Sequence, residues 1–460
     1  MNFKQDLDRI IHLSKYFDKD LTSLKPTRKK QNSKFVDQIR EKALKKMGDW
    51  PRLPDKRLFY VGSVDFMVTE YNDQRKFVIL ETNGGSTRGL FATTFDQIEM
   101  IFNAFKSAID NINGVNQKRV LIGTLPKDDL YQEKIMLGEY LRDRYEKEGI
   151  RIGIYNIFNY NTPQKKNEDI ILIYSNYKNL FEFLDYKNKY FMFLNDKINV
   201  IIGDGVVRRF PNKSFQKENW RNIKTKIINP IYPVTDDKAS TYVAIYMGYD
   251  TLEKYRIQPL QFARVFSKNQ LEELMKLINN MNKNFVLKPF GGSGGAGIKP
   301  FVKNTSIQQI PKIIEDSISE FHQKFNTSRD PFPYTIQEMA QFKLINWKNS
   351  KRTFDLRINV IQEDGNIVPV GGSIRIAKAA HTGKFTKDEF VVNICGDWGV
   401  DFERAWGISP EILKILDLTD EDLIDIFCAT CQIFSVICNK YEEIISFNQW
   451  DKYLQINNTN

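Results

Sequence analysis

The stretch that most constrains this chain of 460 residues is FVLKPFGGSGGAGIKPF, residues 285–301. It contains five glycines within seven positions, directly after a lysine, a proline and a phenylalanine. Residues without a Cβ atom allow backbone N–H groups to close around an anion, so such a loop is typical of a phosphate-binding site. The segments on either side of the glycines decide which kind of phosphate loop this is.

Two common phosphate-binding motifs do not fit this stretch. Gly292, Gly294 and Gly297 match the spacing G-x-G-x-x-G, but a dinucleotide-binding loop needs a helix where the glycines end. The residues that follow, IKPFVKN, include Pro300 and predict a strand. A Walker A loop ends in Gly-Lys-Ser/Thr, whereas Lys288 precedes the glycines. The sequence therefore predicts a strand–glycine loop–strand hairpin with an inward lysine, and the alternative is a flexible surface hairpin.

Composition is that of a globular chain with two or three domains, since 42% of the residues are hydrophobic and 27% are charged. We expect no membrane span, because no run of about 18 apolar residues occurs. The start, MNFKQDLDRIIHLSKYF, predicts an amphipathic helix and no secretory signal, so the expected location is cytoplasmic. The net charge of +10 is scattered apart from one basic cluster at 24–34, which does not favour a nucleic-acid partner.

The four cysteines do not predict a metal site. Cys428, Cys431 and Cys438 recur at helical spacing within LIDIFCATCQIFSVICNKY, which favours the buried face of a helix. Zinc would need further Cys or His ligands nearby, and the three histidines lie far apart in the sequence.

The order of apolar patterns predicts an α+β protein. Helices are expected before residue 48, a β-hairpin at 57–83 and a helix at about 91–112. Residues 118–205 alternate strands and helices, which is typical of a small α/β unit with a mostly parallel sheet. Residues 229–240 resemble a linker. The remaining expectations are a helix in KNQLEELMKLINNMNK, antiparallel strands in TFDLRINVIQEDGNIVPVGGSIRIAK and EFVVNICGDWG, a tight turn at EDGN, and C-terminal helices.

The hairpin at 57–83 carries a pair of carboxylates. A turn centred on Asp73 places Asp65 opposite Glu81, with Asn83 two residues further on the same face. Opposed carboxylates repel each other unless a cation lies between them, and two carboxylates with an amide oxygen suit Mg²⁺. The alternatives are a register shifted by one residue or two acids that face solvent.

Taken together, the glycine hairpin with its lysine and the Glu-x-Asn strand resemble the ATP-grasp superfamily. Its members hold ATP between two α+β subdomains and activate a carboxylate as an acyl phosphate. Further stretches resemble the family's motifs in the same order. DDKAS resembles the motif of the first phosphate lysine, here Lys238, and TIQEMA resembles the adenine-binding hinge. FDLRINV and GGSIRIAK resemble the D-x-R strand and the strand of the reactive arginine, here Arg375, and FVVNICG resembles the late asparagine motif, here Asn393.

The position of the Glu-x-Asn strand departs from the usual ATP-grasp order, in which it comes last. The end of this chain, YLQINNTN, has Gln455 where that glutamate would stand, and the matching strands are N-terminal. With DFM and ETNGGSTRGL, this order resembles the circularly permuted core of eukaryotic-type glutathione synthetase and glutathionylspermidine synthetase. The glycine loop lacks the acidic metal ligand of those enzymes, so Asp65 is taken as the third ligand, and GSVDF lacks the arginine that precedes their aspartate.

The resemblance implies a circularly permuted ATP-grasp fold with an inserted small α/β substrate-binding domain. The expected division is 1–115 for N-terminal helices and the metal-binding hairpin, 116–228 for the small α/β substrate domain, 229–335 for the ATP-grasp small subdomain with the glycine-rich loop, and 336–460 for the large subdomain and C-terminal helices.

The resemblance also implies an ADP-forming ligase that joins a small-molecule carboxylate and an amine through an acyl phosphate, on an amino acid or small peptide, with ATP and Mg²⁺. A homodimer is left open. The implied site has Arg375 in catalysis and Asp65, Glu81 and Asn83 on the metal. The implied ATP-binding residues are Lys238, Lys288, Gly291, Gly292, Ser293, Gly294, Gly295, Gln337, Glu338, Met339 and Ala340.

Several alternatives remain open at this point. Arg375 could form only a surface salt bridge, and Arg357 and Asp355 could form a structural ion pair. Arg208 and Arg209 could anchor a substrate carboxylate, or they could be solvated. A ligase that modifies a peptide or protein chain, and a non-catalytic ATP-binding protein with a degraded core, are the alternative functions.

Overall fold

The structure is a computed structural model of the whole chain. It describes residues 32–71, 74–84, 90, 93–124, 131–157, 159–160, 167–292, 295–325, 329–390, 392, 395–396, 399–400 and 402–454. The helix expected at the start of the chain, together with Ser293, Gly294, Asn393 and Gln455, lies outside these residues.

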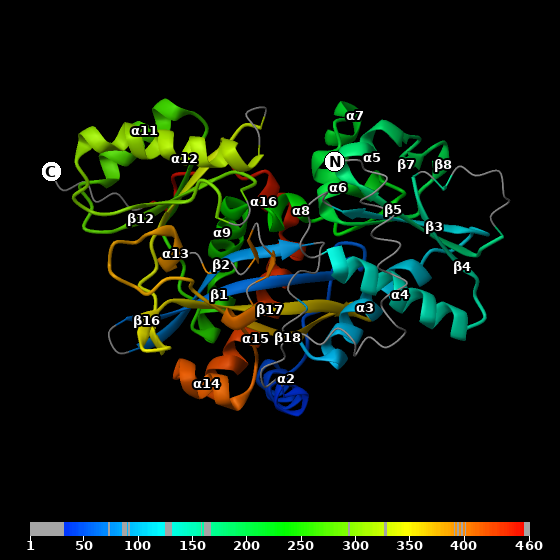
Figure 1. Ribbon diagram of the computed structural model, residues 1–460, viewed down its shortest axis with the longest axis horizontal. Coiled ribbons are helices and arrows are strands. Elements are labelled where there is room, and N and C mark those ends of the chain that lie inside the picture. The colour runs from blue at the N-terminus through cyan, green and yellow to red at the C-terminus, as the bar shows by residue number, and fades with distance from the viewer. Residues whose placement is uncertain are drawn as a thin grey trace.

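The central sheet joins the start of the chain to its last third. Every neighbouring pair is antiparallel, in the order β2-β1-β17-β18-β21. Its strands are β1 Val61–Tyr71, β2 Gln74–Gly84, β17 Phe354–Glu363, β18 Asn366–Ile376 and β21 Ala405–Gly407. Figure 1 shows the blue N-terminal hairpin beside the gold strands β17 and β18 in the middle of the molecule.

Both hairpins of this sheet were expected from the sequence, and both are confirmed. Asp65 stands opposite Glu81 as predicted, but only because of a bulge. Near the turn Tyr71 pairs with Gln74, one residue away from the predicted register, and the shift at Leu80 restores that register. In the EDGN turn, the two central residues have φ of 51° and 92°, as a two-residue hairpin turn requires.

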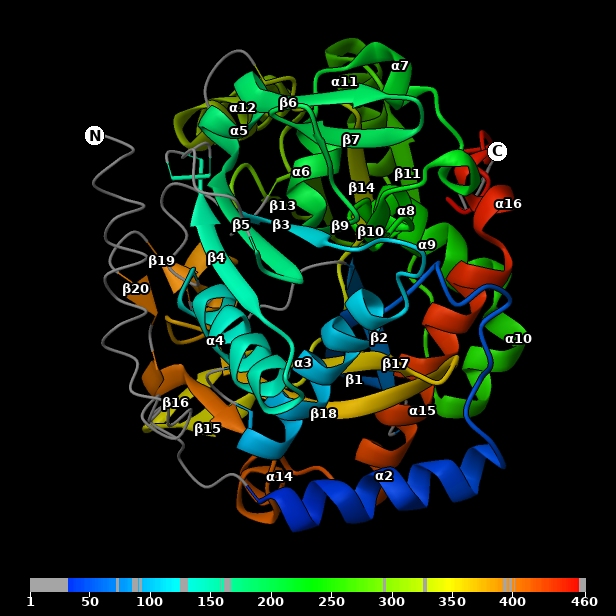
Figure 2. The ribbon, with the colours of Figure 1, turned by 90° about the vertical axis from the view of Figure 1, so that its right-hand side faces the viewer.

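Helices α2 (Ser33–Met47) and α15 (Asp420–Asn439) cover one face of the central sheet (Figure 2). Thr419 caps α15 with a capping box, and the helix is buried over most of its length. The prediction for the three cysteines is confirmed, because all of them are buried in α15. A Cβ atom on Gly62 would lie 2.6 Å from the Phe434 ring, so glycine permits this close approach.

Residues 118–228 form the expected α/β unit with a parallel sheet in the order β10-β9-β3-β5-β4. Its strands are β3 Lys118–Thr124, β4 Ile152–Asn156, β5 Ile170–Asn176, β9 Val200–Ile202 and β10 Lys226–Ile228. Its helices are α4 Tyr131–Lys147, α5 Tyr177–Phe183, α6 Asp204–Arg209 and α7 Lys213–Gln216.

The helix predicted in NLFEFLDYKN is correct only for its first part. The residues after Phe183 leave the helix and begin a small antiparallel sheet in the order β6-β7-β8. Its strands are β6 Leu184–Lys187, β7 Tyr190–Phe193 and β8 Asp196–Lys197. Leu184 and Phe193 pair across this sheet and lie in the hydrophobic core of the unit, so packing overrides the local helical pattern.

A four-stranded antiparallel sheet in the order β11-β14-β12-β13 holds the glycine hairpin. Its strands are β11 Phe262–Val265, β12 Phe285–Pro289, β13 Lys299–Phe301 and β14 Tyr334–Glu338. The predicted strand after the glycines is confirmed by β13, and α11 (Lys268–Ile278) and α12 (Ile310–Phe325) cover the sheet (Figure 1).

One further sequence expectation is wrong and another holds only in part. Residues 229–240 are not an extended linker, because they form α8 (Tyr232–Thr235) and the start of α9 (Lys238–Met247) and are mostly buried. The stretch EFVVNICGDWG, expected to be a strand, starts within the helix α13 (Lys387–Phe390). The described residues of its later part contain only the short strand β19 (Cys395–Gly396) and the start of β20 (Gly399–Val400), which pair with each other in antiparallel fashion.

The remaining elements are α3 Phe95–Asp110, α10 Tyr249–Leu252, β15 Ile345–Trp347, β16 Ser350–Arg352, α14 Pro410–Leu416 and α16 Tyr441–Ile445. Helices α14 to α16 confirm the expected helical C-terminal region. No helix among the described residues is long and apolar enough to cross a membrane.

Candidate active site

The candidate site begins as a row of charged side chains on one face of the central sheet. Asp65 on β1 stands between Glu81 on β2 and Arg357 on β17. Arg375 on β18 stands opposite Asp355 of β17. Residues at alternate positions of a strand share a face, and the intervening residues of β1 pack toward α15 in the main core. The charged row therefore lies on the face away from α15.

Asp65 has different partners from those predicted. It is only 2% exposed, and Arg357 donates to both of its carboxylate oxygens at 2.7 Å from Nε and 2.7 Å from Nη2. Arg375 Nη2 donates to the same carboxylate at 2.8 Å. Burial alone would raise the pKa of Asp65, but the charges of Arg357 and Arg375 outweigh it and hold the pKa well below its usual range. The carboxylate is therefore occupied by two guanidinium groups.

Arg375 forms an ion pair, but the pair is buried rather than on the surface. Its Nε donates to Asp355 Oδ1 at 2.7 Å and its Nη2 to Asp355 Oδ2 at 2.5 Å. The structural ion pairing left open for Arg357 and Asp355 is present, but Arg357 pairs with Asp65 and Asp355 with Arg375. Within the described residues, Nη1 of Arg357 and Nη1 of Arg375 make no hydrogen bond, so each guanidinium has donors left for a ligand.

Glu81 and Asn83 lie on the same face of β2, as predicted. Glu81 Oε2 is 2.8 Å from Lys238 Nζ, and its Oε1 is 3.9 Å from Arg357 Nη2. The buried Nδ2 of Asn83 has no hydrogen-bond partner among the described residues. A buried amide N–H group without an acceptor, next to the charged row, indicates a site where a ligand accepts that hydrogen bond.

Lys238 begins α9, and Asp237 caps that helix by accepting from Ala239 N at 3.0 Å. Burial lowers the pKa of Lys238, but the charge of Glu81 outweighs this effect and raises the pKa above its ordinary value. Lys238 is therefore a charged lysine fixed next to Glu81, the carboxylate that was predicted to bind the metal.

Lys288 points into the protein as predicted, from β12 toward α9. It is 8% exposed, and its Nζ donates to the Tyr242 hydroxyl at 2.7 Å and to Gln337 Oε1. The Tyr242 hydroxyl donates to Leu80 O at 2.9 Å. Burial lowers the pKa of Lys288 to about 7, and the charge of Lys238 adds to this effect. No carboxylate pairs directly with this lysine in the described residues, which suits it to an anionic ligand.

Tyr242 was not predicted as a site residue. It lies four residues after Lys238 on α9, and residues at this spacing share one face of a helix. That spacing was the available sequence signal. The structure shows why the residue matters, because Tyr242 connects Lys288 to the β1–β2 hairpin.

The predicted hinge follows β14. Gln337 contributes its buried side chain to the Lys288 group, and Glu338 forms an ion pair with Lys283 at 2.9 Å. Met339 N donates to Asn284 O at 2.7 Å. Ala340 N has no hydrogen-bond partner in the described part of the chain, so this N–H is available to a ligand.

Three of the four described glycines of the loop adopt a left-handed backbone. Gly291, Gly295 and Gly297 have φ of 63°, 73° and 71°, a region that favours glycine. A Cβ atom on Gly297 would lie 2.8 Å from Ser317 O, so the base of the loop packs against α12. Gly292 lies beside them, 3.4 Å from N to Pro289 O.

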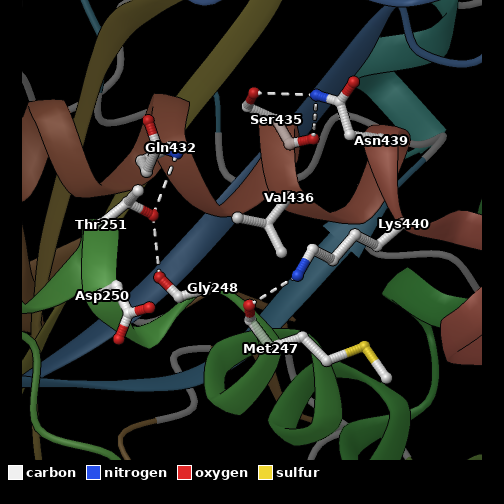
Figure 3. Close-up of a pocket in the computed structure, with 9 residues that line it drawn as sticks. All are labelled: Met247, Gly248, Asp250, Thr251, Gln432, Ser435, Val436, Asn439 and Lys440. Atoms are coloured by element: carbon white, nitrogen blue, oxygen red, sulfur yellow. Dashed lines mark hydrogen bonds between the residues drawn. The ribbon is translucent and has the colours of Figure 1, made fainter.

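A separate cavity of about 290 Å³ lies between α15 and the α9–α10 segment (Figure 3). Several of its polar groups bond to one another: Lys440 Nζ donates to Met247 O at 2.9 Å, and Gln432 Nε2 donates to Thr251 Oγ1 at 3.2 Å. None of the predicted site residues lines it. Its position and its satisfied polar groups do not favour a catalytic role.

Comparisons with known proteins concern the fold. No protein-family model and no curated protein matches the sequence. Among solved structures, the chain is similar to a candidate gamma-glutamylcysteine synthetase from Methylobacillus flagellatus KT, with a TM-score of 0.50 and 12% identity over 89% of this chain and 94% of the other. A glutathione synthetase-like effector from Globodera pallida aligns with a TM-score of 0.40 and 12% identity over 81% of this chain and 84% of the other.

D-alanyl-alanine synthetase A from Vibrio cholerae aligns with a TM-score of 0.34 and 11% identity, over 60% of this chain and 71% of the other. The likeness to the Methylobacillus protein supports the α+β ATP-grasp fold expected from the sequence. At 12% identity the likeness to the Methylobacillus protein concerns the fold alone, so the chemistry rests on the residues described above.

Proposed function

We propose that this chain is an ATP-dependent, ADP-forming ligase that joins a carboxylate to an amine on an amino acid or small peptide. The observation that carries the proposal is the charged row Glu81–Asp65–Arg357–Arg375 beside Lys238 and Lys288, where the central sheet meets the sheet of the glycine hairpin. Cations and acids concentrated in this way suit phosphoryl transfer, which depends on positioning and charge stabilisation.

In the proposed complex, Lys238 and Lys288 bind the phosphates of ATP. Lys288 has no direct carboxylate partner in the described residues, so an anionic phosphate would supply the missing counter-charge. The glycine hairpin offers backbone N–H groups to the terminal phosphates and excludes water. Adenine lies at the hinge, where Ala340 N is the available donor.

Magnesium would fit the oxygens of Glu81 and Asn83, a carboxylate paired here with Lys238 and an amide Oδ1 on the same face of β2. When bound with ATP, the ion neutralises phosphate charge. We withdraw Asp65 from the proposed metal ligands, because its oxygens already accept from Arg357 and Arg375. We propose instead that Asp65 positions these two arginines.

The proposed reaction has two steps. A carboxylate oxygen of the substrate attacks the γ-phosphorus, the bond from that phosphorus to the bridging oxygen breaks, and ADP leaves. The amine nitrogen then attacks the acyl carbon, phosphate leaves with the carbon–oxygen bond electrons, and the nitrogen loses a proton. Arg375 and Arg357 each have donors left for the acyl phosphate and its tetrahedral adduct.

The order of the elements supports the proposal that this core is circularly permuted. The strands with Asp65 and Glu81 come first in the chain, yet they pair with β17 of its last third. The α/β unit at 118–228 comes after these strands and α3, and would supply the substrate-binding part.

The test is Mg²⁺-dependent release of ADP from ATP by the purified protein, with pools of amino acids, small peptides and polyamines. We expect ADP only when a suitable pool is present. Glu81→Gln should reduce the rate by roughly 100-fold or more, as loss of a group that stabilises transferring charge does. Glu421→Gln is the matched control, because that acid pairs with Lys46 on α2, away from the site.

Each outcome has a defined meaning. ATP binding without turnover in every small-molecule pool would contradict a small-molecule substrate and favour a peptide or protein acceptor. Equal ADP release by the wild type and by Glu81→Gln would contradict the proposed site. Failure to bind ATP would overturn the function as a whole.

A further inference from the structure

Arg264 on β11 is a largely buried cation that the proposed chemistry does not use. Its side chain is 10% exposed, and its Nη1 donates to Asp237 Oδ2 at 2.6 Å. The same carboxylate oxygen accepts from Ser240 Oγ at 3.1 Å, and Oδ1 accepts from Ala239 N at 3.0 Å, which caps α9. Arg264 therefore pairs with the acid that fixes the first turn of α9, the turn that begins with Lys238.

Three aromatic rings lie close to the Arg264 guanidinium. Its carbon is 4.6 Å from the centre of the Trp450 ring, 5.6 Å from that of Phe290 and 5.8 Å from that of Phe266. A guanidinium near a ring face is attracted by the negative charge density of that face. Phe290 directly precedes Gly291, the first glycine of the loop. Arg264 therefore contacts the start of the glycine loop as well as the start of α9.

The C-terminal segment Phe447–Leu454 packs against both of these parts. The Tyr453 ring stacks on that of Tyr246 in α9, with the ring centres 4.0 Å apart, and it lies 5.6 Å from the Phe262 ring of β11. Leu454 belongs to the hydrophobic core of the sheet β11-β14-β12-β13. One short segment thus joins the helix of the first proposed phosphate lysine to the sheet that carries the second.

We propose that Arg264 is a positioning residue for nucleotide binding, which holds Lys238 and Gly291 in the arrangement that the phosphates of ATP require. This inference rests on the proposed function and deepens it, because it names a residue outside the phosphate site on which phosphate affinity depends. The ion pair with Asp237 fixes Lys238 at the start of α9. The contact with Phe290 fixes the entry to the glycine loop, and the C-terminal segment braces both.

Arg264 acts through its neighbours and not by contact with ATP. Its Nη1 already has a carboxylate partner, whereas Lys288 has no direct carboxylate partner in the described residues. Binding groups that are held in place before the ligand arrives bind it more tightly, because less freedom is lost on binding. Arg264 stands opposite Thr335 of β14, while the hinge lies beyond the end of that strand. Loss of Arg264 should therefore affect the phosphates and spare the adenine contact.

The test is calorimetric titration of the full chain with MgADP and with adenosine, which has no phosphate. Arg264→Gln should weaken MgADP binding roughly tenfold, as loss of a hydrogen bond between charged groups does, and should leave adenosine binding unchanged. Arg264→Lys keeps the positive charge beside Asp237 and should recover part of the loss. Trp450→Leu removes one ring contact and is the second variant if Arg264→Gln does not fold. It should weaken MgADP binding about threefold.

Arg256→Gln is the matched control. Arg256 also pairs with acids, Asp422 and Asp425, and its guanidinium carbon lies 4.9 Å from the centre of the Phe77 ring. These acids belong to α15, on the face of the central sheet away from the charged row. The control should lower the urea concentration at the midpoint of unfolding without changing the affinity of the folded protein for MgADP.

The other outcomes would overturn the inference. Equal MgADP affinity in the wild type and in Arg264→Gln would show that Arg264 only stabilises the fold. An equal loss of MgADP and adenosine binding would show a general disruption of the subdomain. Both results would leave the proposed ligase function intact, because the Glu81→Gln experiment tests it separately. Absence of MgADP binding by the wild type would overturn the proposed function and this inference together.

Discussion

Lys288 is the residue whose protonation depends most directly on what fills the site. Its pKa of about 7 in the folded chain lies below the ordinary value of 10.5, because the side chain is buried and close to Lys238. Between these two values the unfolded chain binds more protons than the folded one. The free energy of unfolding therefore rises with pH through this window, and the destabilising effect of Lys288 is fully present below pH 7.

We predict that nucleotide binding at pH 8 is accompanied by uptake of a proton. Phosphates placed beside Lys288 Nζ favour its charged form, so up to about one proton should enter for each nucleotide bound. Calorimetric titration of MgADP in buffers with different ionisation enthalpies measures this directly. The observed heat should change with the buffer.

Lys288→Arg is the control for the proton uptake, because a guanidinium stays charged throughout this pH range. In this variant the heats should become independent of the buffer. Buffer-independent heats in the wild type would show that Lys288 is already protonated or lies outside the nucleotide site.

At the scale of elements, the register of the central sheet assembles the charged row. Strands β1 and β17 bring Asp65 next to Arg357, and β18 brings Arg375 within 2.8 Å of the same carboxylate. A one-residue slip of β1 would move Asp65 toward α15 and break every one of these contacts. The bulge at Leu80 is the local feature that sets this register.

We predict that Asp65→Asn slows ADP release by roughly 100-fold or more, as loss of transition-state charge stabilisation does, because Arg357 and Arg375 lose the anion that holds them. The affinity for MgADP and the Mg²⁺ concentration for half-maximal rate should change little. The measurements are rates at varied Mg²⁺ and calorimetric binding of MgADP. A large increase in the required Mg²⁺ would instead restore Asp65 as a metal ligand.

The glycine hairpin is an element that local sequence defines well. The strands β12 and β13 and the positive φ angles of its glycines follow from the apolar run, the proline and the absence of Cβ atoms. By contrast, the small sheet β6-β7-β8 was not predicted. Its residues favour a helix locally, and only their packing in the core of the α/β unit makes them strands.

At the scale of the whole molecule, one ion-pair network ties distant segments to α15. Asp422 accepts from Arg75 of β2 at 2.6 Å and from Arg256 at 2.7 Å. Asp425 accepts from Arg256 at 2.6 Å and from Lys46 of α2 at 2.5 Å. Both acids are 2% exposed, so the acidic side of this network is buried. The network joins β2, α2 and Arg256 to α15, the helix that covers the central sheet.

We predict that Asp422→Asn lowers the free energy of unfolding at pH 7 by about 3 kcal/mol, as breaking a buried ion pair does. Burial alone would raise the pKa of Asp422, but hydrogen bonds from Thr419, Arg75 and Arg256 lower it. A lowered folded-state pKa means that the contribution is present above the ordinary pKa and is lost as pH falls through the folded value.

Urea denaturation at pH 7 and at successively lower pH measures this effect. The difference between the wild type and Asp422→Asn should narrow as pH falls below about 4. Asp420→Asn is the control, because this exposed acid pairs with Lys42 and should cost at most about 1 kcal/mol. A difference that does not depend on pH would mean that packing, rather than charge, accounts for the loss.

The sequence by itself determined the features that depend on neighbouring residues. These are the glycine hairpin, the β-hairpin near residues 57–83, the parallel α/β unit and the buried cysteine helix, whereas the opposition of Asp65 and Glu81 also needed the bulge at Leu80. Local periodicity and turn chemistry are sufficient for them, because their energetics are set within one or two consecutive elements.

Only the tertiary structure decided how charges from distant segments pair. Asp65 pairs with Arg357 and Arg375, and the Tyr242 hydroxyl accepts from Lys288. These residues come from strands and helices far apart in the chain. Because burying an unpaired charge costs free energy, each buried charge pairs with the group that the fold places next to it.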